Sequence, residues 1–275
     1  MAEIPRCACA RFTVPAAAAL LLAAIALPAL AETSQDWKCT GNPDIPWNEQ
    51  IVGCTEALKS GRFTGHGTAV VLYDRGVAYQ KKGDYDLAIA DYDQAIAIDP
   101  KYAKAYGNRG LAYQKGGDND RAVADYDQAI ALDPKFVMAY NNRGYVHQSK
   151  GDNDRAIADF DQAILLDPKY ALAYNNRGLS YQSKGDNDHA IADYNQAIVL
   201  DPKFAFAYNN RGNAYKAKGD FDRAIANYDQ AIVLDPKNAK HYNNRGLAYK
   251  AKGDNDRAVA DHNEAIRLDP KLGSK

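Results

Sequence analysis

The apolar residues in the middle of the chain fall into two groups, and each group has the spacing of one helix face. We predict a first helix over Ala171–Lys184 that ends at Gly185, because glycine tolerates the positive φ of a helix terminus. Asp186 can cap a second helix that runs to about Leu200 and stops before Pro202, since proline pushes the preceding residue out of the α region. The stretch is therefore predicted to be a helical hairpin.

The same pattern returns six times along the chain with a step of 34 residues. One glycine and one proline of the hairpin mark this step, at Gly76, Gly110, Gly144, Gly178, Gly212 and Gly246 and at Pro100, Pro134, Pro168, Pro202, Pro236 and Pro270. A fixed period of this length is typical of a solenoid. A single hairpin leaves one face uncovered, and we expect the next hairpin to cover it.

Several residues recur from copy to copy and match a known repeat pattern. In the central copy they are Tyr174, Gly178, Tyr181, Ala190, Tyr194, Ala197 and Pro202. The pattern resembles the tetratricopeptide repeat family, with copies at 69–102, 103–136, 137–170, 171–204, 205–238 and 239–272. The resemblance implies an all-α fold, a right-handed α-solenoid of helix–turn–helix repeats, that serves as a scaffold for protein–protein interaction.

Motifs and composition favour binding over catalysis. The sequence lacks the HExxH, GxSxG, phosphate-loop and dinucleotide-binding patterns, so we expect neither an enzyme nor a cofactor or metal. The turns with the sequence Asp-Asn-Asp lack the glycine and distal glutamate of a calcium loop, and helix capping explains them more simply. The net charge is −1 and the basic residues are evenly spread, which argues against a nucleic-acid partner.

The N-terminus has the pattern of an export signal over residues 1–31. Arg6 and Arg11 precede an Ala-rich apolar run, and Ala29–Ala31 offers a small-residue cleavage site before Glu32. An uncleaved membrane anchor is the alternative, but the run is shorter than the ~20 residues that span a bilayer. We therefore predict an exported chain, periplasmic or secreted, with no stable membrane insertion after cleavage.

Signal cleavage would leave two cysteines, Cys39 and Cys54. An even number of cysteines in an exported protein predicts a disulfide. No histidine lies near either cysteine in the sequence and no CxxC motif is present, which disfavours a metal site and a redox centre. With a helix that opens near Pro46, residues 32–68 are interpreted as a disulfide-pinned N-terminal cap that ends in a flexible joint at 64–68.

By the same resemblance, the first helix of each repeat lines a concave groove that holds an extended peptide or protein segment. The sixth repeat position carries an asparagine in five copies: Asn108, Asn142, Asn176, Asn210 and Asn244. An asparagine amide can donate to a carbonyl and accept from an N–H, so this row can hold a peptide main chain of any sequence. Recent duplication of one unit, without a role in binding, explains the same row.

The second repeat position indicates which side chains the ligand carries. It is apolar in the middle copies, at Met138, Leu172 and Phe206, and basic on either side, at Lys104 and Lys240. We expect a ligand with central apolar side chains and an acidic group near one of the two lysines. The family's carboxylate clamp for chaperone tails usually needs lysine at the fifth position, where most copies here have asparagine. The identity of the partner stays open.

A structural role is the alternative function. In that interpretation the array is a self-assembling component of the cell envelope that stacks through its repeat ends, with weak self-association.

An arginine precedes the repeat glycine in every copy, and an acid follows sixteen residues later in every copy but the fifth, which has Asn227. The two residues repeat together within a two-helix unit, so we predict an ion pair between the helices. The alternative is that both side chains face water, where pairing contributes little.

Overall fold

The computed structural model describes residue 39 and residues 44–274, and the predicted export signal lies outside them. This part of the chain is all-helical, without a β-strand. Its elements are α1 (Trp47–Lys59), α2 (His66–Lys82), α3 (Tyr85–Ile98), α4 (Ala103–Lys115), α5 (Asn119–Leu132), α6 (Val137–Ser149), α7 (Asn153–Leu166), α8 (Ala171–Ser183), α9 (Asn187–Leu200), α10 (Ala205–Ala217), α11 (Phe221–Leu234), α12 (Ala239–Lys252), α13 (Asn255–Leu268) and the 3₁₀ turn η2 (Pro270–Ser274).

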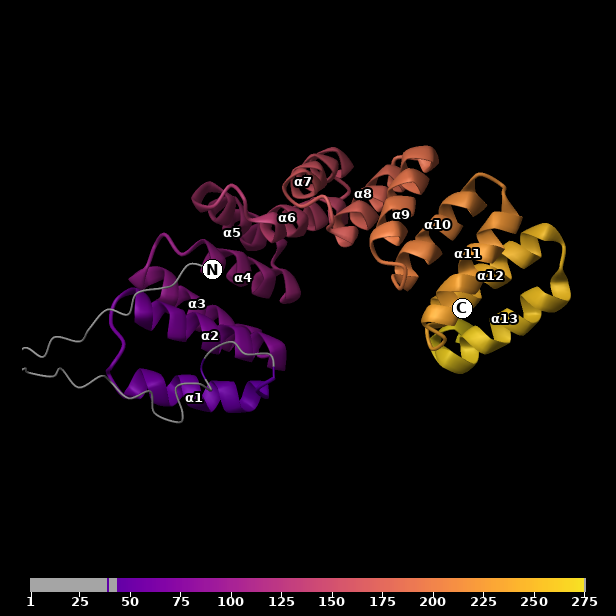
Figure 1. The fold of residues 1–275 in the computed structure, drawn as a ribbon. Helices are drawn as coiled ribbons and strands as arrows, with labels where there is room; N and C mark the ends of the chain where they lie inside the picture. Colours follow the sequence, from indigo (N-terminus) through magenta and orange to yellow (C-terminus); the bar gives the residue numbers. More distant parts are fainter. Residues whose placement is uncertain (1–38, 40–43, 275) are drawn as a thin grey trace, which may run out of the picture.

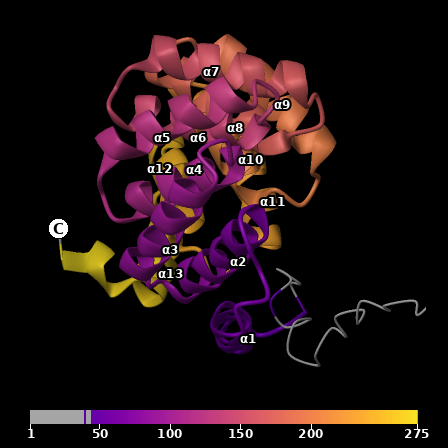
Figure 2. The ribbon, with the colours of Figure 1, turned by 90° about the vertical axis from the view of Figure 1, so that its left-hand side faces the viewer.

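The helices from α2 to α13 form six hairpins that stack in chain order along a curved path (Figure 1). We call the even-numbered helix of each hairpin the first helix and the odd-numbered one the second helix. First helices of successive repeats contact one another, whereas second helices of successive repeats do not. The first helices therefore lie on the inner side of the curve, and the second helices α7 and α9 lie towards the periphery in the end-on view (Figure 2). The expected α-solenoid is confirmed.

A glycine with positive φ stands in the turn of all six hairpins, and an aspartate caps the second helix of the second to sixth hairpins. Gly185 has a φ of +82°, a conformation that side chains with a Cβ rarely adopt. The carboxylate of Asp186 accepts a hydrogen bond from the backbone N–H of His189, which satisfies one of the free donors at the start of α9. The predicted helix end and the predicted cap are both confirmed.

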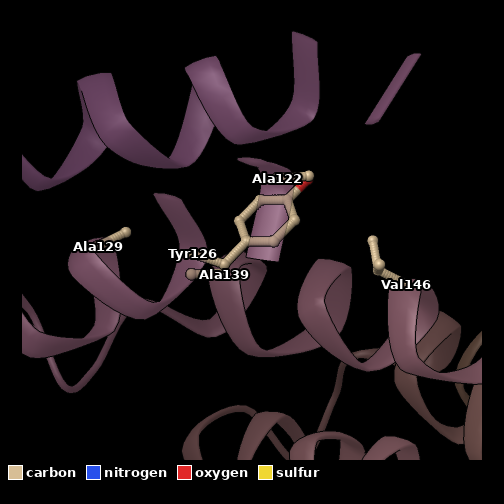
Figure 3. Packing of buried hydrophobic residues seen from close by; sticks show 5 residues of the cluster. All are labelled: Ala122, Tyr126, Ala129, Ala139 and Val146. Atoms are coloured by element: carbon tan, nitrogen blue, oxygen red, sulfur yellow. The ribbon is translucent and has the colours of Figure 1, made fainter. Parts of the chain in front are cut away.

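The core is shared between consecutive repeats. The ring of Tyr126 is fully buried between Ala122 of its own helix and Ala139 and Val146 of the next repeat (Figure 3). The phenolic O–H of Tyr126 donates to Oε1 of Gln114 over 2.8 Å, so this buried tyrosine leaves no unmet donor. A hairpin without its successor would expose this ring, which is why the repeats are stable only as a stack.

The N-terminal cap packs on the first repeat through α1. Cys39 and Cys54 form the predicted disulfide, with their Cα atoms 4.7 Å apart. Cys54 and Ala57 are buried against Val71 of α2, so α1 covers the face that the first repeat would otherwise expose. The prediction of a flexible joint at 64–68 is wrong for residues 66–68, because α2 already begins at His66. The backbone N–H of Ala69 donates to the Gly65 carbonyl and closes the first turn of this helix.

Candidate protein-interaction surface

The second-position side chains project from the inner first helices and are solvent-exposed. The exposed fractions of Met138, Leu172 and Phe206 are 50%, 39% and 52%. Lys104 and Lys240, on α4 and α12, are exposed as well. We call the surface made by these side chains the groove. The apolar residues of the middle repeats and the lysines on either side of them are thus all exposed on the first helices, as the sequence predicted.

The sixth-position asparagines are hydrogen-bonded to the chain itself. Asn176 Nδ2 donates to Asn141 Oδ1 over 3.1 Å, and Asn210 Nδ2 donates to Asn175 Oδ1 over 3.0 Å. Asn244 Nδ2 donates in the same way to Asn209 Oδ1, also over 3.0 Å. Each bond joins the first helix of one repeat to the first helix of the repeat before it.

Weaker amide bonds inside each repeat connect these links into one chain. Neighbouring fifth- and sixth-position asparagines approach to 3.2–3.4 Å in the third, fourth and fifth repeats. Seven asparagines form this amide chain: Asn142, Asn141, Asn176, Asn175, Asn210, Asn209 and Asn244. Sequence reasoning missed the role of the fifth position, because a single hairpin does not show which residue of the preceding repeat lies opposite.

The asparagines of the predicted row differ in how far their side chains are exposed to solvent. Asn176 is 6% exposed, so its amide serves the packing of the repeats. Asn142, Asn210 and Asn244 are partly exposed and keep donor or acceptor capacity towards solvent. Asn108, also partly exposed, donates to the hydroxyl of Tyr73 over 2.6 Å at the N-terminal end of the row.

The fifth repeat carries a half-buried lysine that the sequence analysis did not single out. In the first, second and fourth repeats the second-helix tyrosine donates to a glutamine of the first helix. In the fifth repeat Lys216 takes the place of that glutamine, and Tyr228 donates to Asn213 instead. Burial lowers the pKa of Lys216, and no carboxylate of the described residues offsets this effect. The lysine is therefore a cation on the inner helix that lacks a counter-charge.

His241 lies beneath the C-terminal part of the groove, at a position where the four preceding copies have alanine. It is 1% exposed; Nδ1 lies 3.2 Å from Asn209 Oδ1, and the ring packs edge-on against Phe206. Burial lowers the pKa of His241 and the carboxylate of Asp235 opposes this, so the ring is neutral at pH 7. The ring therefore contacts both Phe206 and, through Asn209, the amide chain.

The N-terminal end of the groove already contains an acid of the chain. Burial raises the pKa of Asp74 to about 6, and the positive charge of Lys104 opposes that rise. Asp74 is therefore largely ionised at pH 7 and supplies a counter-charge to Lys104. Lys104 and Lys240 are the two lysines predicted to receive an acidic group of the ligand. The first helix before Lys240 has Asn210 where the helix before Lys104 has Asp74, so Lys240 lacks this counter-charge.

The predicted ion pairs between the two helices are present in five repeats. In the fourth repeat Arg177 binds Asp193 through two parallel bonds of 2.9 and 2.6 Å, and Asp193 is 5% exposed. Equivalent pairs join Arg75 to Asp91, Arg109 to Asp125, Arg143 to Asp159 and Arg245 to Asp261. In the fifth repeat Arg211 donates to the side-chain oxygen of Asn227 instead.

Each arginine also reaches the repeat before its own, which the sequence analysis did not predict. Nη1 of Arg177 donates to Asp161 of the third repeat over 2.6 Å, and the arginines of the second, third and sixth repeats make the same contact. Arg75, which has no preceding repeat, donates to Thr55 of α1. The arginine thus joins three helices.

Family models match the repeats from end to end. Models described as tetratricopeptide repeat match residues 69–102, 103–136, 125–158 and 239–272, and a model described as TPR repeat matches 148–185, 181–219 and 212–253. The chain is a tetratricopeptide repeat protein. Members of this family are generally non-catalytic scaffolds that bind proteins or peptides. None of the curated proteins compared matches the sequence.

Solved tetratricopeptide repeat structures resemble this one. A crystal structure of MamA is 29% identical, covers 60% of this chain and 97% of its own, and has a TM-score of 0.53. PilW, described as a type IV pilus biogenesis factor, is 22% identical over 75% of this chain and 97% of its own, with a TM-score of 0.69. YrrB, described as a TPR protein with an unusual peptide-binding site, is 23% identical over 66% of this chain and 95% of its own, with a TM-score of 0.53. At these last two identities the likeness concerns the fold.

No helix in the described residues is long and apolar enough to cross a membrane.

Proposed function

We propose that the chain is an exported scaffold whose groove binds an extended segment of a partner protein. The observation that carries the proposal is the row of exposed Met138, Leu172 and Phe206 along the inner helices. Exposed apolar side chains that recur at one position of three successive repeats indicate an interaction site. The disulfide between Cys39 and Cys54 supports an oxidising compartment, and the structural likeness to PilW is in keeping with export.

The charges along the groove favour one position for the acidic group of the ligand. Lys216 and Lys240 lie in the fifth and sixth repeats without a carboxylate partner among the described residues, whereas Lys104 has Asp74 nearby. An acidic group of the ligand therefore gains more at the C-terminal half of the groove, where it provides the missing counter-charge. The partly exposed Asn142 and Asn210 remain available to main-chain groups of the ligand.

Site-specific photocrosslinking in the native compartment tests the proposal. A photoreactive residue at Phe206 or Met138 is expected to capture one defined partner. The control is the same residue at Ala90, which is exposed on the outer face of α3. The variant Lys216→Gln should weaken the capture at Phe206 without loss of helicity. Equal capture at all three positions, or none at Phe206, would reject the groove as the binding site.

Self-assembly is a second candidate, because among the described residues only the short 3₁₀ turn η2, and no further hairpin, packs on the last repeat. A hollow of about 320 Å³ lies between α12 and α13, with Leu247 and Val259 exposed at its edge. In earlier repeats the equivalent surface receives the next first helix. If a second copy covers it, sedimentation should show a dimer at micromolar concentration that the variant Val259→Asp abolishes.

A further inference from the structure

In four repeats, the arginine that joins three helices forms ion pairs with two carboxylates. Arg143, for example, binds the buried Asp159 of its own repeat and the exposed Asp127 of the preceding second helix, over 2.6 and 2.5 Å. The second, fourth and sixth repeats repeat this arrangement. In each, two carboxylates surround one guanidinium, so no positive charge is left over.

The fifth repeat lacks both carboxylates at once. Arg211 Nε donates to Asn227 Oδ1 over 2.7 Å, and Nη1 donates to Asn195 Oδ1 over 2.6 Å. The outer bond and one of the two bonds within the repeat are therefore kept, while both negative charges are gone. Burial lowers the pKa of Arg211, whereas it is raised in the five arginines that have carboxylate partners. The Arg211 side chain stays protonated, so it places a positive charge between α9 and α11.

Asn195, the outer partner of Arg211, lies in the uncharged part of the exposed face of α9, from Ala192 to Val199; Asp188, at the start of that face, pairs with Lys218. In this part of α9 the exposed residues are Ala192, Asn195 and Val199, whereas α7 and α11 each carry an aspartate at the position of Asn195. Val199 is 71% exposed, and the same position in the neighbouring repeats holds Leu165 and Val233, which are 71% and 73% exposed. We call these three residues the outer stripe. Val199 of the outer stripe lies one helical turn after Asn195, the residue of α9 that holds the Arg211 guanidinium.

We propose that the outer face of α9 is a second interaction surface, which binds a protein segment with one carboxylate flanked by apolar side chains. The carboxylate takes the role that Asp161 and Asp229 have in the neighbouring repeats and pairs with Arg211, where burial makes a charge-assisted bond stronger than one in water. The flanking apolar side chains cover the outer stripe. An extended polyanion fits less well, because those two aspartates lie on either side of the site.

Selection of peptides against this surface tests the proposal. A phage-displayed library of random dodecapeptides is selected on the full exported chain and counter-selected on the variant Asn195→Asp, which restores the aspartate that four of the other five repeats carry. That substitution copies four natural repeats, so the variant is expected to fold and to melt slightly higher. The enriched peptides should contain Asp or Glu flanked by apolar residues. Their affinity should fall about tenfold or more in Asn195→Asp and in Val199→Asp.

Two control variants separate charge from shape and one surface from the other. Asn195→Ala removes the amide without adding a charge and should leave peptide affinity near that of the wild type. Phe206→Ala in the groove should leave it unchanged, so failure of this proposal is distinguishable from failure of the groove.

Several outcomes would overturn the assignment. They are enriched peptides without an acidic residue, equal affinity for the wild type and Asn195→Asp, and equal loss in Asn195→Ala. The absence of any peptide that discriminates the two baits is a fourth. A dimer of the chain itself that Asn195→Asp disperses would assign the surface to a second copy instead.

Discussion

At the scale of single residues, the fit between the two helices of a repeat depends on a glycine whose place no larger residue can take without a shift. A Cβ at Gly178 would lie 2.7 Å from Cε1 of the buried Tyr194, closer than real carbon atoms approach. The equivalent glycine in the fifth repeat, Gly212, faces the ring of Tyr228 at the same distance. The repeat glycine is therefore required by packing against the second helix.

We predict that Gly178→Ala lowers the free energy of unfolding by about 1–3 kcal/mol, because the buried ring must shift to admit the methyl group. The measurement is urea denaturation followed by circular dichroism. Gly185→Ala is the matched comparison, since a Cβ there meets no atom within 4 Å and the cost comes from its positive φ alone. An unchanged midpoint for Gly178→Ala would show that the ring can move freely.

The raised pKa of Asp74 predicts how the stability of the fold changes with pH. An aspartate in an unfolded chain titrates near 3.9, whereas burial raises the pKa of folded Asp74 to about 6. Between these values the folded state binds more protons, so this group's contribution to stability is complete below pH 4 and is lost as the pH rises through about 6. Asp74→Asn should therefore melt above the wild type at pH 7, with a smaller difference at pH 4. The exposed Asp86→Asn serves as the control, and a difference independent of pH would contradict the assignment.

At the scale of elements, helices and turns follow closely from the sequence. The caps, the glycine turns, the disulfide and the ion pair within a repeat all depend on residues close in sequence or repeated in register, and all are confirmed by the structure. Contacts between repeats are different. The link from Arg177 back to Asp161 and that from Asn176 to Asn141 depend on how one hairpin is rotated on the last. No spacing within a hairpin encodes that rotation, so these partners were not predicted.

The N-terminal cap is the element that we expect to respond to reduction. The bond between Cys39 and Cys54 closes a loop with a sequence separation of 15, which in the chain-entropy model is worth about 3 kcal/mol. On addition of dithiothreitol, amide hydrogens of α1 should exchange faster, because fewer constraints hold it on α2. Amides of α8, in the middle of the array, should keep their protection. Equal acceleration in both helices would mean that the cap and the repeats unfold as one unit.

At the scale of the whole molecule, stability is the sum of repeat and junction terms. The junction between the fourth and fifth repeats has amides where the others have carboxylates around the arginine. Charge-assisted bonds are stronger than neutral ones, so this junction should be the first to separate. Native-state hydrogen exchange should show α10 opening at a lower free energy than α8. The double variant Asn195→Asp, Asn227→Asp should remove the difference. If it leaves the pattern unchanged, the arginine does not set the order of opening.

The amide chain has a mechanical consequence for the solenoid. Its bonds between repeats lie on the inner helices, along the side that must lengthen when the superhelix straightens. Bending the array open therefore lengthens these bonds, whose nitrogen and oxygen atoms lie 3.0–3.1 Å apart in this structure. If a ligand main chain binds in the groove as proposed, its amides can replace the lengthened bonds, and ligand binding should then favour a straighter array.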